Sequence, residues 1–281
     1  MIGAIIGDIV GSRFESSPKY PKLPVEDRNF ELFTSKCRFT DDSVLTCATA
    51  SALLNIEWYI PRFEVYYKRW GNKYKNRGYG GMFREWLASP DMIFTKSYSN
   101  GVMMRCSPIG IFYRNHSLVQ ALEIAKRSSI YTHNSPESVR GVQSIVSAIH
   151  MAYNGKTKEE IRAFVEENFG HMLNITVEEA RLIPKTTIRC NVTAPQALVA
   201  FMESTDYESA IRNAVYIGGD TDTNAAIAGA IAEAFYGFES IPKHMIDTMF
   251  RIISKEMSGV VLRFYKECNV LNDEKEQPVI P

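Results

Sequence analysis

Apolar side chains recur at helical spacing in one segment after another of this 281-residue chain, whereas the alternation of a strand is scarce. Residues three and four apart share one face of a helix, and alternate residues share one face of a strand. Thr157 with Glu160 also fits a capping box, which predicts a helix that begins there. A short segment, 186–192, is the best candidate for a strand. The spacing predicts helices over 40–54, 118–129, 136–153, 195–203, 207–217, 223–236 and 242–255.

Glycines occupy every fourth position near the start of the chain, at Gly3, Gly7 and Gly11. This spacing places all three on one face of a helix. Because glycine has no Cβ, such a row lets a second helix or a ligand approach the backbone closely. The sequence therefore predicts an N-terminal helix with a close neighbour.

No linker, repeat or shift in composition divides the chain. Its length alone would suit about two domains at roughly 150 residues each, but the continuous helical pattern favours one. We therefore expect an all-α fold: a single compact multi-helical domain over residues 1–270, followed by a C-terminal tail over 271–281.

Composition excludes several classes of protein. The chain has 32 basic and 32 acidic residues, so no overall charge draws it to nucleic acid or to an anionic membrane. No apolar run reaches the ~18 residues of a membrane span, and the start lacks the basic region of a signal peptide. Five cysteines without CxxC spacing argue against a disulfide framework or a zinc cluster. We expect a cytoplasmic protein with free thiols and no membrane partner.

The segment Thr40-Asp41-Asp42-Ser43 stands at the start of a predicted helix. Thr and Asp are favoured N-caps, and carboxylates suit the positive end of a helix dipole, so capping alone can explain the segment. One cap needs only one oxygen, however, and two adjacent carboxylates repel unless a cation or strong donors offset them.

A second acidic segment, residues 218–224 (GGDTDTN), also precedes a predicted helix. Gly218 and Gly219 permit a sharp turn that would gather the carboxylates of Asp220 and Asp222 around one point. A turn followed by an N-cap explains the same residues. The segment resembles half of an EF-hand loop, but the required glycine and closing glutamate are missing, which excludes that motif.

Together the two segments supply four carboxylates and several hydroxyls. Hard oxygen ligands of this kind suit Mg²⁺, Mn²⁺ or Ca²⁺ and disfavour zinc or copper. Four carboxylates suffice for two divalent ions, which could act as Lewis acids and as a template for a substrate with hydroxyls and phosphates.

Two glycine-rich segments, 77–81 and 97–101, could cradle phosphate through their backbone N–H groups, although neither matches a P-loop or a Rossmann fingerprint. Tyr98 could stack on a base or simply pack. Taken alone, His133 fits a cap or a satisfied core residue, and Glu15 fits a solvated surface. No GxSxG motif or catalytic cysteine signature supports a serine or cysteine hydrolase.

These segments, in this order, resemble the ADP-ribosylglycohydrolase family. The resemblance runs from residue 3 to about residue 237, and the Gly-Gly-Asp-Thr-Asp-Thr stretch before a helix of small residues is its most specific part. The matching stretches are 3–15 (GAIIGDIVGSRFE), 40–43 (TDDS), 77–80 (RGYG), 98–105 (YSNGVMMR), 107–110 (SPIG), 132–133 (TH) and 218–237 (GGDTDTNAAIAGAIAEAFYG).

The resemblance implies a single all-α domain with a dinuclear magnesium or manganese centre in a central cleft, and hydrolysis of the N- or O-glycosidic bond at C1″ of ADP-ribose. Glu15 would match the family's acidic residue beside the metals and is our choice for proton transfer; Asp222 would also face the developing positive charge. The implied ligands of the two divalent cations, Mg²⁺ or Mn²⁺, are Thr40, Asp41, Asp42, Asp220, Asp222 and Thr223. The implied diphosphate contacts are Gly80, Ser97, Ser99, Asn100 and Gly101, with Tyr98 and His133 near the adenosine.

Two positions depart from the family pattern. The family often has Gly-Asn-Gly where this chain has Ser99-Asn100-Gly101, and Met103 stands where a small residue is common. We expect a monomeric hydrolase that releases ADP-ribose from a protein side chain, a nucleic acid or a small metabolite. A non-catalytic ADP-ribose-binding homologue and a metal-dependent phosphohydrolase of a nucleotide diphosphate are the alternatives.

Overall fold

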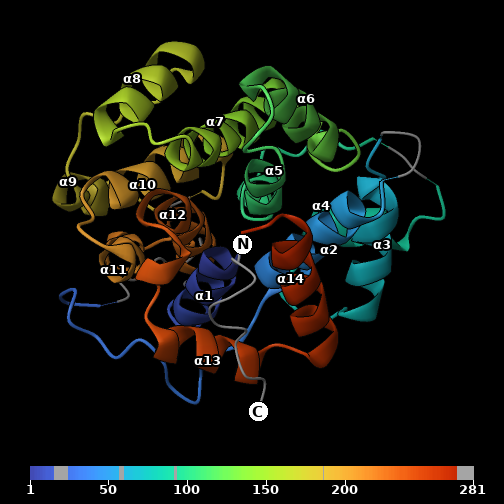
Figure 1. Ribbon diagram of the computed structural model, residues 1–281, viewed down its shortest axis with the longest axis horizontal. Coiled ribbons are helices and arrows are strands. Elements are labelled where there is room, and N and C mark those ends of the chain that lie inside the picture. Colours follow the sequence, from blue (N-terminus) through green and yellow to red (C-terminus); the bar gives the residue numbers. More distant parts are fainter. Residues whose placement is uncertain (16–24, 57–59, 92–93, 186, 271–281) are drawn as a thin grey trace.

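The fold is built from helices, as expected (Figure 1). The computed structural model describes residues 1–15, 25–56, 60–91, 94–185 and 187–270. Over those ranges it has fourteen α-helices, two short 3-10 helices, η1 (Asn100–Val102) and η2 (Phe238–Ser240), and no strand. The α-helices are α1 (Ile2–Gly11), α2 (Asp41–Leu54), α3 (Phe63–Lys73), α4 (Gly81–Ala88), α5 (Ser107–Phe112), α6 (Leu118–Ser129), α7 (Pro136–Tyr153), α8 (Lys158–Phe169), α9 (Val177–Leu182), α10 (Cys190–Met202), α11 (Tyr207–Ile217), α12 (Thr221–Tyr236), α13 (Lys243–Ile252) and α14 (Lys255–Glu267).

The predicted helix bounds are most accurate where the sequence contains a local signal for the start of the helix. Helices α6, α7 and α11 have the predicted bounds, and α2 begins one residue later than predicted. The capping box at the start of α8 is present, because the Thr157 side chain accepts from the Glu160 N–H and the Glu160 side chain accepts from the Thr157 N–H. Helices α3, α4, α5, α9 and α14 were not predicted.

The predicted strand over 186–192 is wrong. Residue 186 lies outside the described residues, and helix α10 already begins at Cys190, five residues before its predicted start. A carboxylate from another helix supports this early start, since Glu137 on α7 accepts from the Asn191 N–H at 3.3 Å. Only an isolated bridge, between Ser99 and Arg189, represents strand pairing there.

Two further boundaries differ from the predictions. Helix α12 begins at Thr221, two residues early. The helix predicted over 242–255 ends three residues early, because α13 ends at Ile252 and a new helix, α14, begins at Lys255, capped by the Ser254 side chain, which accepts from the Met257 N–H at 3.2 Å.

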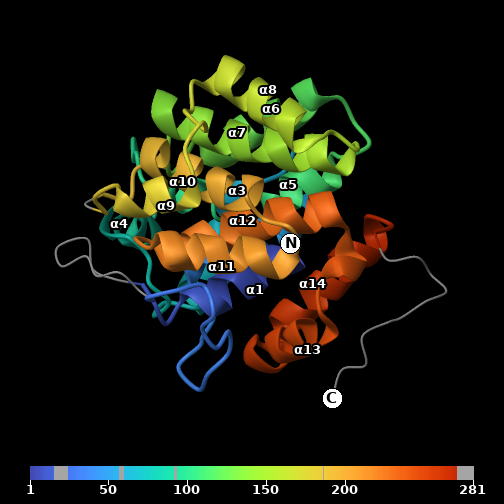
Figure 2. The same cartoon turned by 90° about the vertical axis from the view of Figure 1, so that its left-hand side faces the viewer.

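Helix α12 lies in the middle of the molecule and contacts α1, α7, α10 and α11 (Figures 1 and 2). Its residues from Thr221 to Ala234 are all buried. The glycine row of α1 faces this helix: a Cβ at Gly7 would lie 2.1 Å from the Ala225 carbonyl oxygen, and one at Gly11 would lie 2.4 Å from that of Thr221. The predicted close neighbour is therefore a helix, and the contact places the end of α1 against the first turn of α12.

The helices surround one core rather than two (Figure 2). Helices α6, α7 and α8 lie at one end of the molecule in this view, and α13 lies at the other. All five cysteines are free thiols, as expected. No helix in the described ranges has both the length and the apolar character needed to cross a bilayer. The domain boundary at residue 270 stays a prediction, and the predicted tail 271–281 lies outside the described residues.

Candidate active site

The first acidic segment forms the start of α2. Thr40 is its N-cap, and the Thr40 hydroxyl oxygen accepts from the Asp42 N–H at 3.3 Å. Asp41 and Asp42 occupy the first turn, and Asp42 is buried. Since Thr40 supplies the cap, the two carboxylates are not needed for it. The Asp42 Oδ1 atom is buried with no hydrogen-bond partner among the described residues, which capping cannot explain.

The second acidic segment turns into α12 through two glycines with positive φ, 85° at both Gly218 and Gly219. Asp220 is the N-cap residue, but its side chain makes no capping bond. Instead its Oδ2 accepts from the Asn100 side-chain amide at 2.7 Å. The carboxyl of Asp222 is buried in the first turn. Here too the carboxylates do more than cap the helix.

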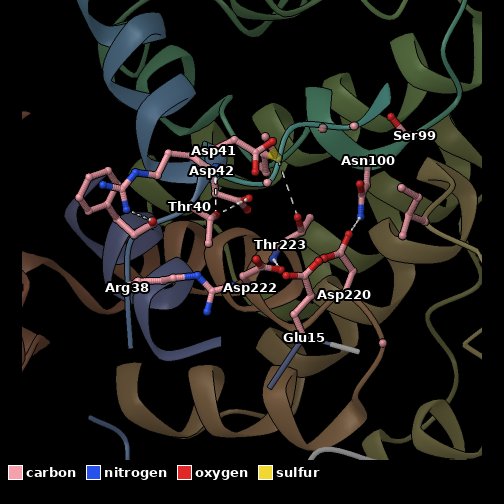
Figure 3. Close-up of a pocket in the computed structure, with 18 of the residues that line it drawn as sticks. Glu15, Arg38, Thr40, Asp41, Asp42, Ser99, Asn100, Asp220, Asp222 and Thr223 are labelled. Atoms are coloured by element: carbon pink, nitrogen blue, oxygen red, sulfur yellow. Dashed lines mark hydrogen bonds between the residues drawn. The ribbon is translucent and has the colours of Figure 1, made fainter. Parts of the chain in front are cut away.

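Carboxylates of both segments converge with those of Asp8 on α1 and of Glu15 after it; Figure 3 shows Glu15 beside Asp220 and Asp222. Carboxylate oxygens of Asp8, Asp42 and Asp222 lie within 4.8 Å of one another. Oxygens of Glu15, Asp220 and Asp222 form a second such group. Asp222 belongs to both. This all-oxygen arrangement is suited to hard divalent cations.

The acids of this site raise one another's pKa values. Burial, followed by neighbouring carboxylates, raises the pKa values of Asp41, Asp42 and Asp222 well above their usual range. Glu15 keeps an exposed surface, yet partial burial of its carboxyl, and next the charge of Asp220, also raise its pKa. Buried carboxylates that repel one another fit a site completed by cations.

Asp8 was not predicted as part of the site. Its side chain is fully buried and accepts from Thr40 and Ser43. The distances to the Asp8 oxygens are 2.9 Å from the Thr40 N–H, 2.7 Å from the Thr40 hydroxyl and 3.1 Å from the Ser43 N–H. Asp8 therefore fixes the start of α2 against α1. The available sequence signal was a charged residue within an otherwise apolar helix.

A cavity of about 340 Å³ is lined by all of these acids except Asp8. Every predicted metal ligand and Glu15 line it, together with Gly80, Ser99, Asn100 and Gly101. Arg77 and Gly78 of the glycine-rich segment 77–81 and Gly219 of the second acidic segment also line it. The sequence reasoning missed the other lining residues, namely Arg38, Phe39, Asn76, Met104, Lys185, Thr187 and Ile188.

An adjoining cavity of about 240 Å³ shares Asp41, Gly80, Ser99 and Gly101 with the first. It adds two of the predicted substrate contacts, Ser97 and His133. Tyr98 is in the lining of neither cavity; the residue is 46% exposed, and the centre of its ring lies 4.8 Å from the guanidinium carbon of Arg189. The structure thus brings together all the predicted substrate residues except Tyr98.

Gly78 illustrates how tightly the cleft is built around Asp41. Its φ is +105°, and a Cβ there would lie 2.9 Å from the Asp41 Oδ1 atom. Gly78→Ala is therefore expected to cost about 1–3 kcal/mol of stability from backbone strain and to displace a carboxylate of the site. Thermal unfolding and calorimetric titration with Mg²⁺ or Mn²⁺ would measure both effects.

Gly81→Ala is the matched control for Gly78→Ala, because a Cβ at Gly81 meets nothing within 4 Å and the position needs no positive φ. We expect it to leave both measurements unchanged. Equal cation affinity in the two variants would contradict the view that Gly78 leaves room for Asp41.

Comparison with known proteins shows the family of this chain. The sequence model of the ADP-ribosylglycohydrolase family matches residues 1–273. The ADP-ribosylarginine hydrolase Tri1 of Pseudomonas putida is 26% identical over 270 residues, or 88% of this chain and 72% of that protein. The ADP-ribosylhydrolase ARH3 of Homo sapiens is 25% identical over 324 residues, or 86% of each chain. A solved ADP-ribosylglycohydrolase-related protein complex aligns with a TM-score of 0.68 at 25% identity, over 95% of this chain and 97% of that one.

Proposed function

Because the chain belongs to the ADP-ribosylglycohydrolase family, we propose that it is a metal-dependent hydrolase that cleaves the glycosidic bond at C1″ of ADP-ribose and releases ADP-ribose from a modified acceptor. The observation that carries this proposal is the convergence of acids in two groups that share Asp222, beside a cleft that Glu15 and the acids at the starts of α2 and α12 line.

The proposed cofactors are two divalent cations, Mg²⁺ or Mn²⁺. The unpartnered Asp42 Oδ1, the raised pKa values and the all-oxygen donors support them. When bound, such cations supply Lewis acidity and a template for hydroxyl groups and water. The residues proposed to hold them are Thr40, Asp41, Asp42, Asp220, Asp222 and Thr223.

Glu15 is the residue proposed to transfer a proton. It lines the cleft and keeps an exposed surface, and its carboxyl either accepts a proton from the attacking water or donates one to the leaving group. The Asp222 carboxylate would stabilise the positive charge that develops at C1″ in an oxocarbenium-like transition state.

The two adjoining cavities, of about 340 and 240 Å³, suit a ligand with two parts. We assign the diphosphate to Gly80, Ser97, Ser99, Asn100 and Gly101, and the adenosine to the neighbourhood of Tyr98 and His133. Contacts with the diphosphate would provide binding energy remote from the reacting bond. Asn100 has a second role, since its side-chain amide donates to Asp220 at 2.7 Å and to Thr193 at 3.1 Å.

The acceptor is proposed as a class: a protein side chain, a nucleic acid or a small metabolite that carries ADP-ribose. The name of the relative Tri1 specifies ADP-ribosylarginine as its substrate, whereas the name of ARH3 specifies an ADP-ribosyl group without an acceptor. The monomeric state and the cytoplasmic location expected from the sequence stay predictions.

Chelation tests the proposal directly. We expect the purified protein to release free ADP-ribose from at least one substrate in a panel of ADP-ribosyl-arginine peptide, ADP-ribosyl-serine peptide, ADP-ribosylated DNA and O-acetyl-ADP-ribose. EDTA should abolish the release, and Mg²⁺ or Mn²⁺ should restore it. Either cation at a hundredfold excess over its Kd should stabilise the protein by about 2.7 kcal/mol, which raises its Tm by about 5 °C.

The products separate this function from its alternatives. AMP as the product would identify a phosphohydrolase that cleaves the diphosphate. Tight binding of ADP-ribose without turnover of any acceptor would identify a non-catalytic homologue. Release of ADP-ribose that EDTA does not affect would overturn the metal dependence.

A further inference from the structure

A buried arginine stands behind the second cavity and has no part in the proposed chemistry. Arg105 is 1% exposed and lines this cavity. Its guanidinium carbon lies 4.0 Å from the centre of the Tyr67 ring. The Arg105 Nη2 atom donates to the Thr132 hydroxyl oxygen at 2.6 Å, and its Nε and Nη1 atoms have no hydrogen-bond partner among the described residues.

The hydrogen bonds continue from Thr132 to the cleft. The Thr132 hydroxyl lies 2.9 Å from Nδ1 of His133, and Nε2 of His133 lies 3.0 Å from the Ser99 hydroxyl. Thr132 and His133 are both buried. The chain Arg105–Thr132–His133–Ser99 therefore connects a buried cation to a residue that lines both cavities.

Which group donates and which accepts in this series of hydrogen bonds follows from the hydrogens that each group has. A guanidinium only donates, so the Thr132 oxygen accepts from Arg105 and its own hydrogen is available for His133 Nδ1. Burial, and next the Arg105 charge, hold the pKa of His133 well below its usual range, so the ring is neutral at pH 7. The opposite tautomer would leave the buried Thr132 hydroxyl hydrogen without an acceptor, which costs free energy.

We propose that Arg105, acting through Thr132, holds His133 in the tautomer protonated at Nε2 and thereby makes the Ser99 hydroxyl a hydrogen-bond donor for the diphosphate of the substrate. Arg105 and Thr132 are positioning residues in this proposal, which rests on the proposed function in placing the diphosphate at Ser99.

The consequence for an anionic ligand is large because Ser99 has a single hydroxyl hydrogen. If Nε2 of His133 were an acceptor, it would take that hydrogen, and Ser99 would present only lone pairs to the phosphate. With Nε2–H as the donor, the Ser99 oxygen accepts from His133 and its hydrogen can point to the ligand. The Ser97 hydroxyl, 2.9 Å from that of Ser99, can exchange partners with it when the ligand binds.

The test combines nitrogen NMR with calorimetry at neutral pH. Long-range ¹⁵N–¹H correlation of the full chain, with the His133 signals assigned by His133→Gln, should show the proton on Nε2 and an Nδ1 that accepts a hydrogen bond. In Thr132→Val the preference for Nε2 should be lost, so that part of the His133 proton is found on Nδ1 and Ser99 is no longer held as a donor. Affinity for ADP-ribose should fall about 10-fold, because a hydrogen bond to a charged group is weakened.

Two variants keep the outcome interpretable. Thr132→Ser retains the hydroxyl and should restore both the Nδ1 signal and the affinity, which a merely structural role in packing would not require. Ser99→Ala should weaken ADP-ribose binding about as much as Thr132→Val while leaving the proton on Nε2.

A proton found on Nδ1 in the unmodified protein would overturn the proposal. So would a Thr132→Val variant that binds ADP-ribose as tightly as the unmodified protein. Failure of the unmodified protein to bind ADP-ribose at all would instead contradict the proposed function, and the NMR spectrum would still decide the tautomer.

Discussion

Replacing Asp222 with asparagine is expected to lower kcat/KM for release of ADP-ribose by about 1,000-fold or more, which corresponds to roughly 4 kcal/mol of transition-state stabilisation. Asp222 is the residue common to both groups of acids, and its side chain is buried in the first turn of α12. Asparagine preserves the size of the side chain but removes its charge and one ligand oxygen. Initial rates at saturating Mg²⁺ and Mn²⁺ would measure the loss.

The same variant should not be less stable than the unmodified protein when metal is absent. Burial and neighbouring carboxylates raise the pKa of Asp222, so above pH ~4 the folded state binds more protons at this group than the unfolded state does. Stability from this group is therefore present at low pH and is lost as the pH rises through the raised pKa. Asparagine does not titrate. The Tm of Asp222→Asn should therefore exceed that of the unmodified protein by an amount that grows as the pH rises from about 5 to about 7.5.

Asp247→Asn provides a control for general effects of removing an acid. Asp247 lies on α13, away from the cleft, where its exposed carboxylate pairs with Lys243 at 2.8 Å. We expect this variant to keep full activity and the full rise in Tm on addition of Mg²⁺ or Mn²⁺. An Asp222→Asn protein that also kept that rise in Tm would show that Asp222 is not a ligand.

Helix starts could be predicted where their signals are local. Thr157 and Glu160 are three residues apart, so the sequence itself contains both halves of the cap of α8. The start of α10 depends instead on Glu137, which lies 54 residues from Asn191 in the chain. No periodicity within 186–192 could reveal that contact, and β-branched residues there favoured a strand.

The residues of the candidate site could likewise be predicted only where their signals are local in the sequence. The pairs Asp41–Asp42 and Asp220–Asp222 were predicted because each pair lies within three consecutive residues at or just before the start of a predicted helix. Asp8 was missed because Thr40 and Ser43, the residues that donate to it, lie 32 and 35 positions further along the chain. The close packing of α1 on α12 is what brings these distant acids together. The glycine row predicted a close neighbour, either a helix or a ligand, but not which one.

Replacing Glu15 with glutamine is expected to lower kcat by about 100- to 10,000-fold, the range typical of a lost general acid or base. The amide cannot transfer a proton but retains one oxygen and nearly the same size. If Glu15 acts in proton transfer, ADP-ribose affinity and the rise in Tm with Mg²⁺ or Mn²⁺ should both persist. Glu26→Gln, at an exposed position of the same N-terminal part of the chain, should behave like the unmodified protein.

The role of Glu15 can be resolved further because proton acceptance and proton donation respond to different changes. If the carboxylate activates water, formate should restore part of the activity of Glu15→Ala by acting as a substitute base. If the carboxyl protonates the leaving group, the defect should shrink for acceptors that leave readily without a proton, such as an ADP-ribosyl ester, and formate should have no effect. Loss of the metal-induced rise in Tm in Glu15→Gln would contradict both roles, because the oxygen group of Glu15, Asp220 and Asp222 would then need Glu15 as a ligand.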